Sequence, residues 1–278
     1  MAMVDIGKWN NLKVVKLAEF GVFLDGGDDG EILLPRRYEP KSCEVGDALD
    51  VFIYFDSEDR LVATTEIPKA TVGDFALLKV VAVENVGAFL DWGLPKDLFL
   101  PFAEQTSPPR LGQNVLVYLY LDKSDRISAS MRLDRNVEKN HGDLKEGQSV
   151  ELIIAGQTDL GFKAIIENRR MGIIYSNEVF KALQYGQRLQ GFIKTLRPDG
   201  KIDLSLTKPG HQAAVEDISP KILEMLQQKG GFLAINDKTS AEKIHELFGV
   251  SRKKYKIALG GLYKKRLITV DEDGIRLV

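Results

Sequence analysis

The chain has 278 residues, 44% of them hydrophobic, and a formal net charge of −2. These values are typical of a soluble chain of several small domains, and they exclude a protein that binds polyanions through its overall charge. Cys43 is the only cysteine, which excludes an intramolecular disulfide and a site with several thiolate ligands, and fits a reducing compartment.

The charge is distributed unevenly along the chain. Residues 1–65 carry 7 Lys and Arg against 13 Asp and Glu, a balance of −6, whereas residues 219–278 carry 12 against 7, a balance of +5. This asymmetry points to the later part of the chain as the place for a polyanion. No apolar run approaches the roughly 18 to 20 residues of a membrane span, and the first residues lack the pattern of a secretory signal. We therefore expect a cytoplasmic protein that is not inserted in a membrane.

A long internal repeat opens the chain. Residues 7–63 match residues 73–129 without a gap at an offset of 66 positions. A period of this length indicates duplicated domains rather than solenoid units. A more divergent third copy follows, in which Gly161 lies 74 positions after Gly87.

Each copy contains five short apolar or alternating runs separated by turns rich in Gly and Asp, as is typical of β-strands. Five strands of this length predict a small closed barrel of the OB type rather than an open sheet. The predicted fold is therefore mainly β with a C-terminal α+β module. We predict three tandem five-stranded barrels over residues 1–66, 67–136 and 143–208, followed by a winged helix-turn-helix domain over residues 215–278.

The repeats resemble the ribosomal S1-type RNA-binding domain, in which aromatic residues flank a glycine on the second strand. An acid and a basic residue lie four apart in the last hairpin of that domain. The matching positions of the first copy are Phe20, Gly21, Phe23, Asp56 and Arg60, and those of the second are Gly87, Phe89, Asp122 and Arg126. The resemblance implies that aromatic side chains stack on the bases of single-stranded RNA while Arg and Lys contact phosphates.

Two interpretations remain open at these positions. Phe23 and Phe89 are either core residues of alternating strands or stacking residues on an RNA-binding surface. The Asp–Arg pairs are explained equally well as exposed ion pairs of the hairpins. In the third copy, a basic cluster with few acids nearby predicts the best RNA-binding face of the three barrels. Its members are Lys163, Arg169, Arg170, Tyr175, Arg197 and Lys201, and Arg126 is the corresponding basic residue of the second copy.

After residue 217 the apolar period changes to that of a helix. We predict two helices capped by Ser219 and Ser240, a third helix from residue 251, and two strands around the turn DEDG, which is the order of a winged helix. Gly260 and Gly261 in the third helix each cost roughly 1 kcal/mol relative to alanine. Their presence predicts close packing of this helix against another helix.

The predicted third helix carries the most concentrated positive charge of the chain, with no acid between Ser251 and Arg266. Such a helix can neutralise several phosphates, which gives salt-sensitive binding with little sequence preference. The alternative is a solvated face whose opposite, apolar side packs in the domain. The candidate residues are Arg252, Lys253, Lys254, Lys256, Lys264, Lys265 and Arg266.

No catalytic or metal-binding pattern is evident in the sequence. His141, His211 and His245 are dispersed, and the HExxH, CxxC, GxSxG and Walker motifs are missing. We therefore expect no metal, no cofactor and no enzymatic activity.

Three S1-type barrels and a winged helix, with the segments GVFLDGG, EILLP and FGVSRKKYK, resemble the bacterial conserved virulence factor B family. The resemblance spans nearly the whole chain and implies an RNA-binding regulator that acts after transcription. Two alternatives remain: a protein-interaction scaffold on the ribosome or RNA polymerase, and a winged helix that binds duplex DNA. The sequence leaves the oligomeric state open.

Overall fold

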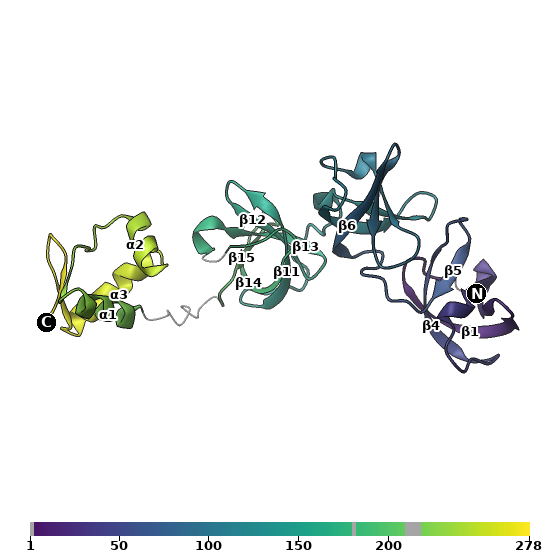
Figure 1. Cartoon of the computed structure of the whole chain (residues 1–278), viewed down its shortest axis with the longest axis horizontal. Helices are drawn as coiled ribbons and strands as arrows, with labels where there is room; N and C mark the ends of the chain where they lie inside the picture. Colours follow the sequence, from purple (N-terminus) through teal and green to yellow (C-terminus); the bar gives the residue numbers. More distant parts are fainter. Residues whose placement is uncertain (1–2, 180–181, 209–217) are drawn as a thin grey trace.

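The chain folds into three closed β-barrels followed by a domain of three helices and a small sheet (Figure 1). The computed structural model describes residues 3–179, 182–208 and 218–278. The predicted fold, mainly β with a C-terminal α+β module, is confirmed. Within these described ranges, no helix is long and apolar enough to cross a bilayer.

Each barrel has five strands in the same order, and its third and fifth strands pair in parallel to close the sheet. One set of alternating side chains fills each barrel while the other faces outward. The first barrel consists of β1 (Trp9–Ala18), β2 (Gly21–Asp25), β3 (Glu31–Pro35), β4 (Ala48–Phe55) and β5 (Leu61–Thr64). The second consists of β6 (Phe75–Glu84), β7 (Gly87–Asp91), β8 (Leu98–Pro101), β9 (Asn114–Leu121) and β10 (Ile127–Ser130). The third consists of β11 (Ser149–Thr158), β12 (Gly161–Ile166), β13 (Arg170–Tyr175), β14 (Arg188–Leu196) and β15 (Ile202–Ser205).

The second strand of every barrel begins at a glycine with an equivalent cross-strand partner. These glycines have φ between 151° and 154°, and a Cβ on each would lie 2.1–2.5 Å from a carbonyl oxygen of the third strand. Only glycine fits such a position. The shared register shows that the divergent third copy is the same barrel as the first two. The three pairs are Gly21–Pro35, Gly87–Pro101 and Gly161–Tyr175.

An aromatic cluster joins the first two barrels. Phe52 of β4 packs edge-on against Trp92, which follows β7, with ring centroids 5.8 Å apart, and Tyr54 approaches the same indole at 6.5 Å. All three rings are buried and share one apolar cluster with the core of the second barrel. Because buried aromatic rings contribute large apolar areas, this contact stabilises one relative orientation of the two barrels.

A second aromatic junction joins the second and third barrels. The rings of Phe75 and Tyr118 lie 4.9 Å apart and pack against isoleucines of the third barrel. The side chain of Asn168, in the turn after β12, accepts a hydrogen bond of 2.8 Å from the backbone N–H of Phe75. Tyr118 lies 66 positions after Phe52, so the first two barrels use an equivalent residue of β9 and β4 in their contacts with the next barrel.

The C-terminal domain has the order of elements expected for a winged helix. Its rings Phe248 and Tyr255 stack 5.6 Å apart where α2 meets α3. Ser240 caps α2, as predicted, by accepting a hydrogen bond from the backbone N–H of Lys243. The elements are α1 (Ser219–Gln228), β16 (Phe232–Leu233), α2 (Ala241–Phe248), α3 (Arg252–Lys264), β17 (Ile268–Val270) and β18 (Ile275–Leu277).

Two local predictions for this domain are wrong. Helix α1 begins at Ser219 and is not capped by it, because Ile218 has φ −69° and ψ −1° and occupies the N-cap position. Gly260 and Gly261 are not sites of close packing against another helix, because a Cβ at either position would meet nothing within 4 Å. In the part of the chain that the structure describes, the two glycines therefore weaken α3 without a compensating contact.

Replacing Gly260 by alanine is expected to raise the free energy of unfolding of the winged helix by about 1 kcal/mol, because alanine orders the helix at lower entropic cost. Urea unfolding of the full chain, followed by the helical signal in far-ultraviolet circular dichroism, measures the change. Gly21→Ala is the control with the opposite expectation, since its Cβ would lie 2.1 Å from the carbonyl oxygen of Leu34. A lower stability of Gly260→Ala would contradict the open surroundings of this residue.

Candidate nucleic-acid interface

Each barrel presents an equivalent outward face on its second and third strands. Two residues after the strand-opening glycine, the second strand carries a half-buried side chain with a half-buried partner on the third strand. Phe23 and Phe89 therefore lie on the barrel surface, so the interpretation of them as core residues is wrong, and their stacking on RNA stays a prediction. The three cross-strand pairs are Phe23–Leu33, Phe89–Phe99 and Lys163–Ile173.

The face of the first barrel is an open aromatic surface. Phe20 is 60% exposed, and its ring meets the ring of Phe23 edge-on at 5.9 Å. The ammonium group of Lys16 lies 5.3 Å from the centroid of Phe23. A cation beside two accessible rings is an arrangement that can contact both a base and a phosphate.

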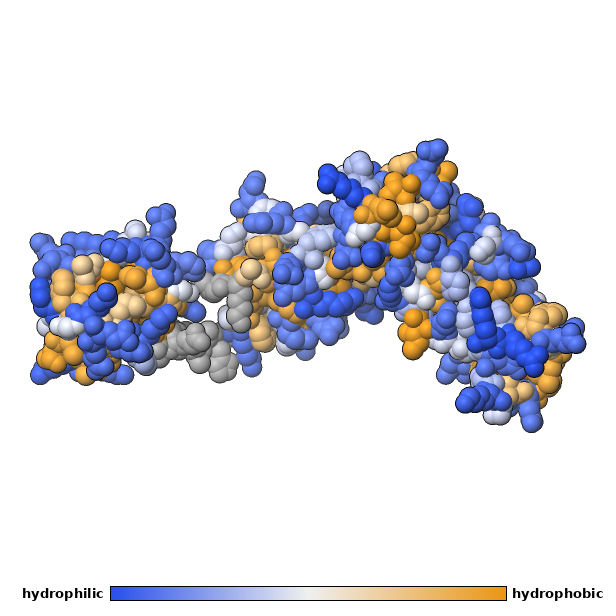
Figure 2. Space-filling view, in the orientation of Figure 1, coloured by the Kyte–Doolittle hydropathy of each residue, from blue (hydrophilic) through white to orange (hydrophobic). Residues whose placement is uncertain are grey.

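The face of the second barrel forms one side of a cleft of about 560 Å³. The rings of Phe89 and Phe99 lie 5.4 Å apart on this side, with Val86 at the rim. The opposite side comes from the first barrel, whose β4–β5 hairpin contributes Tyr54 and Asp59. The cleft thus depends on the junction between the two barrels. Figure 2 shows apolar side chains at the surface of this part of the chain.

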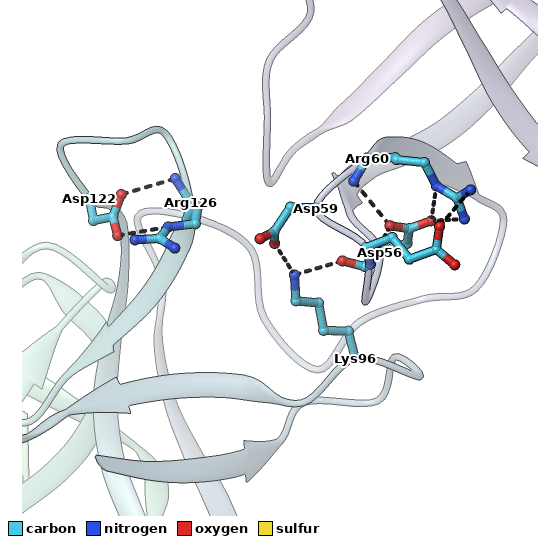
Figure 3. A network of polar contacts seen from close by, with 7 residues as sticks. Asp56, Asp59, Arg60, Lys96, Asp122 and Arg126 are labelled. Atoms are coloured by element: carbon cyan, nitrogen blue, oxygen red, sulfur yellow. Dashed lines mark hydrogen bonds and ion pairs between the residues drawn. The ribbon is translucent and has the colours of Figure 1, made fainter. Parts of the chain in front are cut away.

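An ion-pair network connects the hairpin of the first barrel to the cleft (Figure 3). The Lys96 ammonium donates to the carbonyl oxygen of Asp56 at 2.6 Å and to the carboxylate of Asp59 at 2.8 Å. The hydrogen bond and the charge of Lys96 hold the pKa of Asp59 below its ordinary value. Because Lys96 is already paired with acid, the cleft is better suited to an uncharged base than to a phosphate.

The predicted hairpin pairs exist as ion pairs. Arg60 donates to Asp56 through two nitrogens at 2.9 and 2.7 Å, and it also pairs with Glu58 at 2.9 Å. Arg126 pairs with Asp122 at 3.5 Å. The side chains of Arg60 and Arg126 are both more than half exposed. A phosphate has to compete with a carboxylate for them, which weakens them as phosphate ligands.

The basic cluster of the third barrel has more acidic neighbours than we expected. Lys163 pairs with Asp134 at 3.0 Å, and Lys201 pairs with Asp199 at 3.3 Å. Tyr175 donates a hydrogen bond of 3.4 Å to Asp203, which also lies 4.0 Å from Arg197. The sequence did not predict Asp134 as a neighbour of Lys163, because Asp134 belongs to the segment before the third barrel and approaches Lys163 only in the folded chain.

Arg170 is the clearest correction among the predicted binding residues. Its side chain is buried, pairs with Glu138 at 2.5 Å, and donates from Nε to the carbonyl oxygen of Asn140 at 2.8 Å. It therefore attaches the segment before the third barrel to β13 and is not available to RNA. Its neighbour Arg169 is exposed.

The basic face of the winged helix lies on α3. A shallow depression there is lined by Arg252, Lys253, Lys256 and Ile257. Its acidic neighbour is Asp237, which lies 3.7 Å from the ammonium group of Lys256. All of the predicted cations except Lys254, which is half-buried, are exposed, including Lys264, Lys265 and Arg266.

Phe99 and Lys96 were missed by the sequence reasoning. Phe99 stands in the run LFLPF, and the register of β7 and β8 would have placed it beside Phe89. Lys96 had no comparable signal, because its partners belong to another barrel. No group of three or more His, Cys, Asp or Glu that could hold a metal ion occurs within residues 3–179, 182–208 and 218–278. His211 lies outside these ranges.

Comparison with protein families accounts for the first two barrels and the last domain. The S1 domain family matches residues 6–66 and 72–132, and the CvfB-like winged helix domain family matches residues 220–277. The chain therefore has two S1 domains and a CvfB-like winged helix domain, as the resemblance to the conserved virulence factor B family implied. The third barrel lies outside the matched residues but has the same strand order as the other two. Domains of both kinds bind nucleic acids and are not catalytic.

The chain is also similar to relatives of comparable length. The uncharacterized protein YitL of Bacillus subtilis is 29% identical over 93% of this chain and 89% of its own length. Conserved virulence factor B of Staphylococcus saprophyticus is 24% identical over 98% of this chain and 94% of its own length. A crystal structure of a multidomain protein with nucleic acid binding domains from Streptococcus pneumoniae is 27% identical, covers 98% of each chain and has a TM-score of 0.42.

Replacing Lys96 by methionine is expected to raise the pKa of Asp59 toward its ordinary value, because both the hydrogen bond and the charge that lower it are removed. The pKa of Asp59 in the folded state lies below its ordinary value. The ion pair therefore stabilises the junction at pH values above the ordinary carboxyl pKa, and this stabilisation is lost as the pH falls through the pKa of the folded state. The difference in stability between the wild type and the variant should therefore shrink in acid.

Carboxyl-carbon NMR titration of the full chain measures this pKa. Asp56, in the same hairpin, is the internal control. Burial raises its pKa, and hydrogen bonds from Arg60 and Glu58 outweigh this effect, so its pKa lies below the ordinary value mainly because of contacts within the hairpin. An unchanged titration of Asp59 in the variant would show that the ion pair does not form in solution.

Proposed function

We propose that this protein binds single-stranded RNA in the cytoplasm and regulates bacterial gene expression after transcription, without catalysing a reaction. In this proposal, the barrel faces bind bases and the basic face of α3 binds phosphates. The observation that carries the proposal is the aromatic cleft of the second barrel. Two accessible rings beside an apolar rim match the stacking surface that OB-type barrels use for unpaired bases.

The proposed division between bases and phosphates is supported by the ion pairs. In the cleft of the second barrel, Lys96 and Arg126 are both paired with carboxylates. On α3, by contrast, Lys253 is exposed and has no acidic partner in the described part of the chain. Binding at several weak sites of one chain raises the overall affinity through effective concentration. This explains why partly neutralised barrel faces remain useful.

Phe89→Ala is expected to weaken binding of a short mixed-sequence RNA by about 1–3 kcal/mol, roughly 5- to 150-fold, because stacking on one base is lost. Fluorescence anisotropy with labelled RNA measures the dissociation constant. Phe102→Ala is the matched control, since Phe102 is 54% exposed in the same barrel but does not line the cleft. Equal effects of the two variants would contradict a stacking site at Phe89.

Replacing both Lys253 and Lys256 by glutamine is expected to reduce the slope of log K against log salt by about 1.4, at roughly 0.7 per phosphate contact of a single strand. The matched control replaces Lys221 and Lys243, which are exposed on the other two helices. Competition between single-stranded RNA and duplex DNA belongs to the same experiment. A preference for the duplex would overturn the proposed RNA specificity, and no binding of RNA at low salt would favour a protein-interaction scaffold.

A further inference from the structure

A second cleft, of about 380 Å³, lies on the third barrel between β11, β12 and residues 131–135. It occupies the place equivalent to the aromatic cleft of the second barrel. Gly156 lies 74 positions after Ala82, and Lys163 lies 74 positions after Phe89. Within the described part of the chain, no aromatic side chain lines it. This cleft therefore cannot bind a base by stacking in the manner proposed for the second barrel.

The wall formed by residues 131–135 is held firmly in place. Leu133 and Val137 pack against the apolar cluster between the second and third barrels, which contains Ile153. Arg132 donates from Nε to the carbonyl oxygen of Ala103 at 2.7 Å. The charged side chains of this wall thus project from a backbone that is fixed on both barrels.

The cleft carries three cations and one carboxylate. Arg132, Arg135 and Lys163 line it together with Asp134. Lys163 donates to both carboxylate oxygens of Asp134, at 3.0 and 3.1 Å. Arg135 is exposed, and no acid pairs with it in the described ranges. The charge balance of the cleft is therefore positive even with the ion pair formed.

The floor of the cleft is open at Gly156. This residue lies where the pairing of β11 and β12 shifts register, and a Cβ built on it would meet nothing within 4 Å. A small group can therefore approach the backbone between Lys163 and the wall. A tetrahedral anion with several acceptor oxygens fits this set of Lys and Arg donors better than a planar base does.

We propose that this cleft binds a phosphodiester of the RNA backbone, and that Asp134 holds the place of the phosphate in the free protein. The inference rests on the proposed function and adds to it the chemistry of one site. Asp134 offers Lys163 two oxygens and one negative charge, as a phosphodiester does. Because exposed ion pairs of this kind are weak, an incoming phosphate displaces the carboxylate and recruits Arg135 as well.

Two variants that break the same ion pair test the proposal, because it predicts opposite effects for them. Asp134→Asn removes the internal competitor and is expected to tighten binding of a short single-stranded RNA by about fivefold. Lys163→Gln removes a phosphate ligand, and is expected to weaken binding by a similar factor and to lower the salt slope by about 0.7. Fluorescence anisotropy on the full chain measures both, and thermal unfolding checks that each variant is folded.

Arg135→Gln provides a second readout. Its loss of affinity should be the same for oligouridine and oligoadenosine, because a phosphate site does not read bases. Lys145→Gln is the control, since Lys145 is exposed on the same barrel but does not line the cleft. Changes of equal sign for Asp134→Asn and Lys163→Gln would show a purely structural ion pair and overturn the phosphate site. RNA binding by the wild type would then still uphold the proposed function, whereas a wild type that binds no RNA overturns both.

Discussion

The aromatic packing between successive barrels determines where the candidate sites of the barrels lie. A five-stranded barrel buries only a small core, so its orientation relative to the next barrel depends on the contact between them. Phe52, Tyr54 and Trp92 supply that contact for the first pair, and Phe75 with Tyr118 supplies it for the second. Each cleft has one wall from the barrel that bears it and one from the preceding part of the chain. The clefts are therefore properties of the array and not of a single S1 domain.

One strand position gives the three barrels different chemistry. It carries Phe23 on an open surface, Phe89 in an aromatic cleft, and Lys163 in a cleft lined by arginines. The change from aromatic to cationic along the chain has the same direction as the overall charge, which is acidic in the first barrel and basic in the winged helix. We infer that the duplication preserved the barrel while this position diverged, so that equivalent faces of the three barrels present different side chains.

The ion pairs limit what each basic residue can do. Ion pairs with carboxylates largely neutralise the positive charge of Arg60, Arg126 and Lys96 within the hairpins and the junction. Exposed pairs of this kind contribute little stability, about 0–1 kcal/mol each. Their main effect is on electrostatics, because they leave the cleft of the second barrel with little net attraction for phosphate. On α3, by contrast, Lys253 is exposed and has no acidic partner among the residues that the structure describes.

The sequence by itself determined the local architecture of this protein. Alternating apolar residues, with a glycine where a Cβ would strike a carbonyl oxygen, specify the same barrel three times, and the 66-residue period also predicted that Phe23 and Phe89 are equivalent. Only the tertiary structure decided which basic residues are accessible. Arg170 is buried against Glu138, and Lys163 meets Asp134, because the connecting segment folds back on the third barrel. Such contacts join residues distant in sequence, and periodicity carries no information about them.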